Sequence, residues 1–375
     1  MNRKKIKIIV SVLILVIVVI LGVLYIIDTN KMKNDEPVLF STWGKKYTPS
    51  IKSIKTDMNV VLSLEDRISE NTVWCGTFNL IWNDLKNDLV KQDIVFNQQT
   101  EIINNLNKGT FTTADLSDDS YYKIYGMPSL QLKEQIEEGI KEKFNETSDI
   151  LDDFNWDSKD LKDYFLYVML KKEFEFPQIF TELKNGKFGE YENVKYFGID
   201  DSTKDNVRNQ VEVLYYNSKE DFAVKLITKT DDEVILVKGC NKNTFKEVYN
   251  EVNEKTNTTY SEFSKIDKLK IPNITFNLKK EITEVENKRF AFANGDEYKI
   301  EKALQTIQFQ LNKKGGKIKS ESGMMVNKTA TIMPEKSREF FFDDTFTIFL
   351  KEKNKQLPYF AAKISDISDV QEIEK

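Results

Sequence analysis

The sequence has 375 residues, a formal net charge of −5 and no histidine. This chain alone therefore cannot build a Ser-His-Asp or Cys-His-Asn triad or a common histidine-containing zinc site. Its lysines are interleaved with acidic residues, so nothing in the charge pattern indicates nucleic-acid binding. The abundance of Lys, Asn and Ile is typical of a protein encoded by an AT-rich bacterial genome.

The N-terminal residues predict a membrane anchor. Residues 8–27 are a run of Ile, Val and Leu interrupted only by Ser11, Gly22 and Tyr25. A run of this length can cross a bilayer as a helix. The basic residues of segment 1–7 predict a cytoplasmic tail there and an extracellular position for everything after residue 27. A cleaved signal peptide is the alternative, but no Ala-x-Ala-like site follows the run.

We therefore expect a single-pass signal-anchor protein of the cell membrane with its C-terminal part outside the cell. Residues 28–60 predict a stalk, because Pro37, Trp43 and Pro49 interrupt every periodic pattern there. Residues 61–375 lack a Gly/Ser-rich or Pro-rich linker and are enough for one large core. Two domains are the alternative, and the sequence predicts no oligomeric state.

Within this extracellular part, the first half is expected to contain most of the helices. Apolar residues at helical spacing predict helices at Phe78–Val90, Leu132–Phe144 and Thr244–Glu254. Asn243 or Thr244 is the expected cap of the third helix.

The second half is expected to contain mostly strands. On Leu304–Leu311, Ile307, Phe309 and Leu311 share one face and Gln308 and Gln310 the other, the pattern of a half-buried strand. Further strand-like runs are Val211–Tyr216, Phe222–Ile227, Ile271–Phe276, Phe340–Lys351 and Leu357–Ile364.

A long connection joins the strand at Leu304–Leu311 to the Phe-rich run. Residues 317–338 contain no aromatic side chain, and so long a connection is usually functional or disordered. After Gly315 the residues alternate. One face has Gly316, Ile318, Ser320 and Ser322, and the other has Lys317, Lys319 and Glu321. If this segment formed a strand, one phase would leave the three charges in water and a one-residue shift would bury them. Chance alternation in an exposed loop is the alternative.

These segments, in this order, resemble the serpin superfamily. Leu311–Gly315 resembles the serpin hinge Val-Asn-Glu-Glu-Gly, with Lys313 and Lys314 in place of both acidic residues. Asn71–Leu85 stands where serpins have the helix start Asn-Val-Phe-Phe-Ser-Pro-x-Ser-Ile, without its serines. The chain also ends as serpins do, with a Phe-rich strand, a short charged turn and a closing strand.

Four more segments fit the same order. Leu166–Phe180 resembles the central-sheet strand and the aromatic turn of serpins. Val211–Tyr216 and Phe222–Ile227 resemble the later hairpin, and Ile271–Phe276 stands at the serpin Leu-Pro-Lys-Phe strand. The resemblance implies an α+β domain, with helices packed on large mixed β-sheets and an exposed reactive-centre-like loop near the C-terminus.

The resemblance also implies a function, suicide inhibition of an extracellular serine or cysteine protease. The protease cuts the loop, which then inserts as a new strand into the central sheet. The hinge would comprise Gly315, Gly316, Ile318, Ser320 and Ser322. The cut would fall within Lys328, Thr329, Ala330 and Thr331, where Lys328 suits a trypsin-like enzyme and Ala330 an elastase-like or subtilisin-like one.

Other functions stay open at this point. A non-inhibitory serpin fold used for binding or scaffolding is one alternative, and an unrelated α+β surface domain is another. We expect no catalytic residue, no cofactor and no metal. Acidic pairs that could in principle serve a glycosidase or a calcium site are interpreted as solvated loop charge. These pairs are Asp118–Asp119, Asp152–Asp153, Asp200–Asp201 and Asp231–Asp232.

The two cysteines, Cys75 and Cys240, are too few for a disulfide framework or a metal cage. Cys75 stands at a predicted helix start, where the thiol pKa can be lowered, or it is a small buried core residue. The sequence does not determine whether the two cysteines pair.

Overall fold

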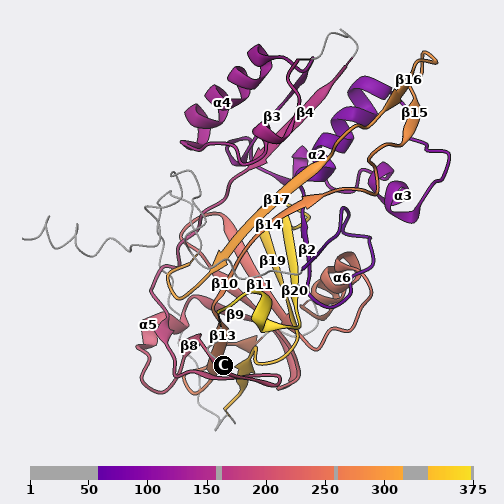
Figure 1. Cartoon of the computed structure of the whole chain (residues 1–375). Coiled ribbons are helices and arrows are strands. Elements are labelled where there is room, and N and C mark those ends of the chain that lie inside the picture. The colour runs from indigo at the N-terminus through magenta and orange to yellow at the C-terminus, as the bar shows by residue number, and fades with distance from the viewer. Residues whose placement is uncertain (1–57, 158–162, 257–260, 316–336, 373–375) are drawn as a thin grey trace, which may run out of the picture. The chain divides into compact units, whose positions relative to one another are not determined.

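The computed structural model describes residues 58–157, 163–256, 261–315 and 337–372 (Figure 1). The chain divides into two compact units, Met1–Pro49 and Ser50–Lys375, and all described residues belong to the second. The predicted tail (1–7), the predicted membrane span (8–27) and the predicted stalk up to residue 57 lie outside the described residues. Within the described ranges, no helix has both the length and the apolar character needed to cross a membrane.

An eight-stranded sheet forms the centre of the domain (Figure 1). Neighbouring strands are antiparallel except for the first pair, β1 and β2. In spatial order the strands are β1 (Asn59–Val60), β2 (Thr72–Cys75), β20 (Phe360–Ile364), β19 (Phe346–Glu352), β11 (Asp232–Lys238), β10 (Asp221–Ile227), β9 (Val211–Ser218) and β12 (Ser261–Glu262).

The position of β1 extends the folded domain beyond the predicted boundary. Asn59 and Val60, predicted as the end of the stalk, pair with Thr72 and Val73 of β2, and Met58 is buried. A strand of two residues is too short to show period-2 alternation, so the sequence pattern gave no sign of it.

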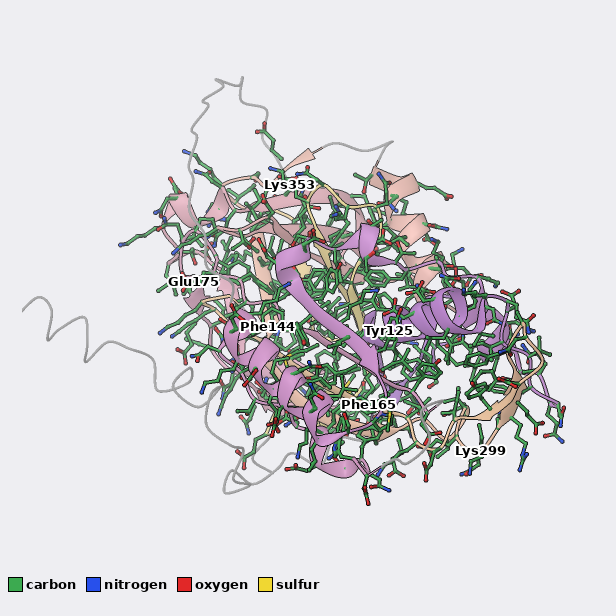
Figure 2. The ribbon with its side chains drawn as sticks, turned by 90° about the horizontal axis from the view of Figure 1, so that it is seen from above. Tyr125, Phe144, Phe165, Glu175, Lys299 and Lys353 are labelled. Atoms are coloured by element: carbon green, nitrogen blue, oxygen red, sulfur yellow. The ribbon has the colours of Figure 1, made fainter. Side chains whose placement is uncertain are left out.

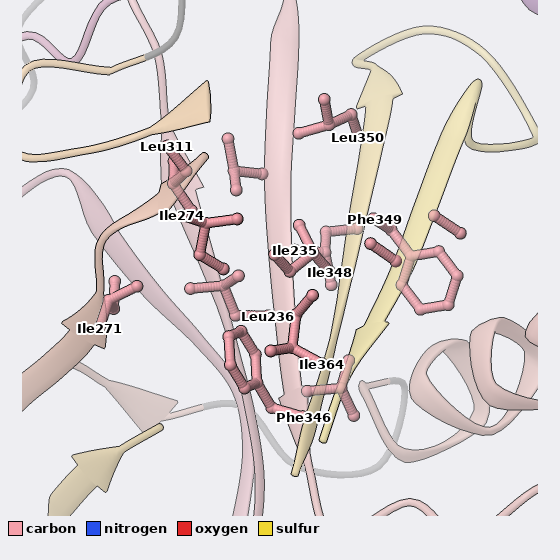
Figure 3. Packing of buried hydrophobic residues seen from close by; sticks show 14 of the residues in the cluster. Ile235, Leu236, Ile271, Ile274, Leu311, Phe346, Ile348, Phe349, Leu350 and Ile364 are labelled. Carbon is pink, nitrogen blue, oxygen red and sulfur yellow. The ribbon is translucent and has the colours of Figure 1, made fainter. Parts of the chain in front are cut away.

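Both faces of the eight-stranded sheet are covered. Every residue of β19 is buried, as expected for a strand between two packed layers. Phe349 contacts Phe245 and Tyr249 of helix α6 (Phe245–Thr256), with ring centroids 6.2 and 5.4 Å apart. On the opposite face, Phe360 of β20 stacks on Phe309 at 4.6 Å. Figure 3 shows this apolar core around Leu236, Ile348 and Phe349.

Smaller sheets surround this core. A four-stranded sheet has the order β18 (Glu339–Phe341), β13 (Lys268–Pro272), β8 (Tyr196–Ile199) and β5 (Thr181–Glu182). The two-stranded sheets are β14 (Ile274–Glu281) with β17 (Leu304–Leu311), β3 (Tyr121–Gly126) with β4 (Phe165–Leu170), β15 (Arg289–Ala291) with β16 (Glu297–Lys299), and β6 (Gly186–Phe188) with β7 (Tyr191–Val194).

The three predicted helices are confirmed. Helix α2 (Thr77–Asp84) continues as a π-helical segment, Leu85–Val90, and α4 spans Leu130–Phe144. Thr244 caps α6, because its Oγ1 accepts a hydrogen bond from the Glu247 amide at 3.1 Å. The remaining helices are α3 (Glu101–Asn107), α5 (Asp205–Arg208) and the short 3₁₀ turns Thr113–Asp115, Asp118–Ser120, Leu151–Asp153 and Ile367–Asp369.

The predicted strand at Leu304–Leu311 is confirmed with the same bounds as β17. Ile307, Phe309 and Leu311 are buried, whereas Gln308 is exposed, so the predicted faces are also correct.

Three other predictions need correction. Ile271–Phe276 is not one strand, because Asn273 separates β13 and β14, which belong to different sheets. The Phe-rich run is not one strand, because residues 342–345, with a bend at 344–345, separate β18 and β19, which belong to different sheets. Asn71–Leu85 does not simply open a helix, since Thr72–Cys75 is strand β2 and the helix begins only at Thr77.

The β14–β17 pair is attached to the central sheet mainly by aromatic packing. Phe309 lies between Phe276 of β14 at 5.7 Å and Phe360 of β20 at 4.6 Å, and it is 6% exposed. Such a ring buries a large apolar area and packs with favourable aromatic geometry.

We predict that Phe309→Ala lowers the free energy of unfolding by about 3–5 kcal/mol, because it leaves a cavity between two layers. Urea unfolding followed by circular dichroism measures the change. Asn277→Ala, on the exposed face of β14, is the matched control and should cost less than about 0.5 kcal/mol. Equal costs for the two variants would contradict this role of Phe309.

Candidate functional site

Two pairs of strands each present an edge that no described strand covers. β17 forms an eight-residue antiparallel ladder with β14, and β4 forms a six-residue ladder with β3. Among the described residues, β17 pairs with no other strand and neither does β4. The sequence predicted β4 as part of a larger central sheet, so its isolation with β3 is a difference from that expectation.

The two open edges converge at one point. β4 ends at Leu170 and its chain runs on to Glu175, which forms a β-bridge with Gly315 beyond the end of β17. Phe176 donates its amide to the Lys314 carbonyl at 3.0 Å, and Phe180 donates to the Lys313 carbonyl at 2.9 Å. Both the Glu175–Gly315 bridge and the Asn312–Gly315 bridge are antiparallel. The chain has therefore already turned back at Gly315, and the ends of the β4 and β17 segments on its two sides run in the same direction.

Gly315 occupies a position that only glycine can take without strain. Its φ is +127°, and an added Cβ would lie 2.4 Å from the Phe174 carbonyl oxygen and 2.6 Å from the Glu175 Cα. The turn before it is held by Asn312, whose Oδ1 accepts the Lys314 amide at 2.9 Å. The close approach of the two chains at the junction thus depends on the missing side chain.

The hinge lysine Lys313 has a local partner. Its ammonium lies 2.5 Å from the Glu182 carboxylate at the edge of the four-stranded sheet. This hydrogen-bonded ion pair lowers the pKa of Glu182. The pair is exposed to solvent, so it contributes at most about 1 kcal/mol to stability.

The other predicted site residues are outside the part of the chain that the structure describes. This applies to the hinge residues Gly316, Ile318, Ser320 and Ser322 and to the scissile candidates Lys328, Thr329, Ala330 and Thr331.

The chain returns to the domain at an anchored residue that the sequence pattern did not indicate. Arg338 directly precedes β18, and its guanidinium Nη2 lies 2.6 Å from Oδ2 of Asp267, which is 1% exposed. The Arg338 amide also donates to Asp267 Oδ1 at 3.0 Å. Because β18 pairs in parallel with β13, this end of the connection is held by backbone and side-chain bonds together. An isolated arginine carries no motif, so the sequence gave no signal for it.

Helix α4 packs on the β3–β4 pair through Leu132, Ile136 and Ile140, which cluster with Tyr167. Figure 2 shows α4, with Phe144 at its end, beside the strands that carry Tyr125 and Phe165. The segment that follows α4 reaches the other pair of strands. Gln308 of β17 donates to Asp149 at 3.1 Å.

A second contact joins the same segment to β14. Lys279 pairs with Asp153 at 2.5 Å, and the two side chains are 45% and 32% exposed. Exposed pairs of this kind contribute about 0–1 kcal/mol. The polar connection between the two strand pairs on this face is therefore weak and easily broken.

Both cysteines lie in surroundings that raise the thiol pKa. Cys75 lies in β2 and is buried, as expected for a small core residue, and burial raises the pKa of its thiol. Burial likewise raises the pKa of Cys240 to about 12. Both are free cysteines. No group of acidic and cysteine side chains suited to a metal ion occurs within the described ranges.

Comparison with known proteins gives structural matches only. No protein-family model matches the sequence, and no curated protein does. The mouse protein-Z dependent protease inhibitor is 12% identical with a TM-score of 0.46, covering 80% of this chain and 91% of its own. Serpin48 of the insect Tenebrio molitor is 9% identical with a TM-score of 0.44, covering 80% and 92%. Human thyroxine-binding globulin is 11% identical with a TM-score of 0.41, covering 80% and 92%. The chain resembles serpins in its fold.

We predict that Gly315→Ala destabilises the domain by roughly 2–3 kcal/mol, because the new Cβ strains the backbone and pushes the junction apart. Gly189→Ala is the control, since Gly189 also has a positive φ of +53° but nothing within 4 Å of an added Cβ. The control should cost about 1 kcal/mol. Urea unfolding compares the two variants, and a cost at Gly315 no larger than that at Gly189 would contradict the close approach.

Proposed function

We propose that this chain is a cell-surface inhibitor of a serine or cysteine protease that acts by loop cleavage and strand insertion. The target protease cuts the connection between Gly315 and Ser337, and the freed segment pairs with β4 and β17. The observation that supports this proposal most directly is that the open edges of β4 and β17 run in the same direction and converge at Gly315.

The direction of the strands suits an inserted segment. A chain that folds back at Gly315 runs antiparallel to β17, and also antiparallel to β4 because both strands point toward the junction. Antiparallel pairing on both sides is the more stable ladder geometry. Each new backbone hydrogen bond contributes about 0.5–1.5 kcal/mol, so a strand paired on both edges would gain several kcal/mol.

The anchored far end of the connection explains why a cut is needed. Residues 316–336 are 21 residues. Pairing along the eight residues of β17 needs about 27 Å of extended chain, at roughly 3.4 Å per residue, so the connection is long enough to supply this strand. An intact connection is also held at its far end by Arg338 and β18. Cleavage removes that constraint and lets the first half move alone.

The alternation of side chains sets the orientation of the inserted strand. With Gly315 as the hinge glycine, Gly316, Ile318, Ser320 and Ser322 face the core beneath β17. Lys317, Lys319 and Glu321 then face water, where they need no partner. The cut is proposed within Lys328, Thr329, Ala330 and Thr331, beyond the segment that inserts.

A second candidate function is a non-inhibitory serpin-like protein that binds or scaffolds at the cell surface. The hinge lysines favour it, because Lys313 is paired with Glu182 and would have to leave this partner if the hinge opened. In that function, cleavage of the connection would leave β4 and β17 unpaired. Retention in the membrane through residues 8–27 is common to both proposals.

The orientation predicts which substitutions block insertion. The wild-type chain is cut once within residues 323–337 and compared with the uncut chain. The cut chain should melt at least about 10 °C higher, because the inserted strand adds stability and added stability raises the melting temperature. Ser320→Arg should abolish the rise, because it buries an unpaired charge. Differential scanning calorimetry measures both.

Lys319→Arg is the matched control, since residue 319 faces water in the proposed orientation, and it should keep the full rise. A rise that survives Ser320→Arg would contradict the orientation. No rise in the wild type would favour the binding or scaffolding function.

A further inference from the structure

A buried charged cluster lies at one end of the eight-stranded sheet. Asp232, the first residue of β11, is directly opposite Glu352, the last residue of β19, and the two are 3% and 5% exposed. The Lys172 ammonium reaches both carboxylates, at 3.0 Å from Asp232 and 2.6 Å from Glu352. Like charges directly opposite in a ladder repel, and burial increases the penalty. The two acids are therefore tolerated together because Lys172 lies between them.

This cluster corrects one prediction from the sequence. Asp231–Asp232 was interpreted as solvated loop charge, but Asp232 is among the most buried carboxylates of the described chain. Its partner comes from a segment sixty residues away, counted as 232 − 172. No local pattern connects such distant residues, so the pairing could not be recognised from spacing.

The hydrogen bonds of the cluster come from one end of the β3–β4 pair, where β3 begins and β4 ends. Ser117 and Ser120, just before β3, donate to Glu352 Oε1 through the Ser117 amide at 3.1 Å and the two hydroxyls at 3.0 and 2.9 Å. Lys172 is the second residue after β4. The acids thus belong to the eight-stranded sheet and the donors to the β3–β4 pair.

The cluster also lies close to the proposed site. Glu175, which forms the bridge with Gly315, follows three residues after Lys172. Glu175 is labelled in Figure 2. The end of β4 that would form the first pairs with an inserted strand is therefore the end that Lys172 fixes.

Other titratable groups around the cluster include Tyr359, Cys75, Lys351 and Glu233. Tyr359 donates its hydroxyl to Asp232 Oδ1 at 3.0 Å, and burial raises the pKa of Tyr359 above its ordinary value. The Cys75 thiol lies beyond Tyr359. On the same two strands, Lys351 pairs with Glu233 at 3.1 Å.

The pKa values of the two acids shift in opposite directions. Burial raises the pKa of Asp232, against the opposing effect of Lys172. Burial also acts to raise the pKa of Glu352, but Lys172 and the serine donors outweigh it and hold that pKa below its ordinary value. Because burial raises the pKa of Asp232 in the folded state, proton uptake by Asp232 on acidification favours the folded state.

We propose that Lys172 is a positioning residue that fastens the junction end of β4 to the eight-stranded sheet by neutralising Asp232 and Glu352. This role of Lys172 does not depend on the proposed function. Only the further consequence, that the edge of β4 is held in place for an inserted strand, rests on it. Without the ammonium, two facing carboxylates repel within the core, and the β3–β4 pair separates from the sheet at this end.

The test is hydrogen exchange by mass spectrometry on the uncut full chain, following peptides over residues 121–126 and 163–172. We expect Lys172→Met to accelerate exchange in both peptides at least tenfold at pH 7.5 after correction for intrinsic rates. Lowering the pH to 5.5 should reverse part of this acceleration, because the two acids can then share a proton. The peptide over residues 304–311 should exchange as in the wild type.

Two further variants separate charge from packing. Lys172→Met with Asp232→Asn removes the repulsion and should restore slow exchange at pH 7.5. Lys171→Met is the matched control, because Lys171 pairs with Glu146 at 2.7 Å and does not reach the cluster. If Lys172→Met alone does not fold, recovery of a cooperative melting transition in the double variant is the expected result.

The proposal is overturned if amides in Lys172→Met exchange as in the wild type. It is also overturned if neither the lower pH nor the added Asp232→Asn substitution slows the accelerated exchange of Lys172→Met. It is also overturned if the double variant fails to recover folding. Because the chain is uncut and no protease is present, these results do not depend on strand insertion. Failure of the proposed function would show instead as a missing melting-temperature rise in the cleaved wild type.

Discussion

β4 and β17 each have one open edge, where the backbone N–H and C=O groups have no ladder partner among the described strands. The need to pair these groups is the constraint on which the proposed function depends. Main-chain groups without a ladder partner are a liability in any sheet, since they attract other strands. Here the two edges run parallel and meet at Gly315, where the chain changes direction. A single antiparallel strand could satisfy both edges, and the sequence that follows Gly315 alternates in the way such a strand requires.

The two pairs of strands are attached to the eight-stranded sheet by different chemistry. β14–β17 is held by apolar stacking of Phe309 on Phe360, which has no dependence on charge. β3–β4 is held at its junction end by Lys172 between two buried acids. Between the pairs, the described polar contacts away from the junction include an ion pair and an amide hydrogen bond that are exposed and of small energy. Each pair is thus attached to the eight-stranded sheet by buried contacts, whereas the polar contacts between the two pairs are weak.

Much of the fold could be predicted because it depends on local pattern. The faces of β17, the helix α4 and the capped start of α6 follow from spacing within a few residues. Gly315 is predicted as the hinge glycine because Leu311–Gly315 resembles the serpin hinge sequence. The structure places it where a side chain would clash with the backbone.

What could not be predicted depends on contacts between distant segments. The division of the Phe-rich run between two sheets follows from the strands it meets, β13 and β11, and not from its own composition. Asp232 looked like loop charge because its partner Lys172 belongs to another strand pair. The same holds for Arg338, whose partner Asp267 is buried beside β13.

The most direct test is hydrogen exchange of β4 and β17 in the full chain before and after one cut within residues 323–337. If a strand enters between them, amides in peptides 165–170 and 304–311 should both become at least tenfold better protected after the cut, because their open edges gain partners. Unchanged or weaker protection in either strand would contradict the account, since an inserted strand must pair with both.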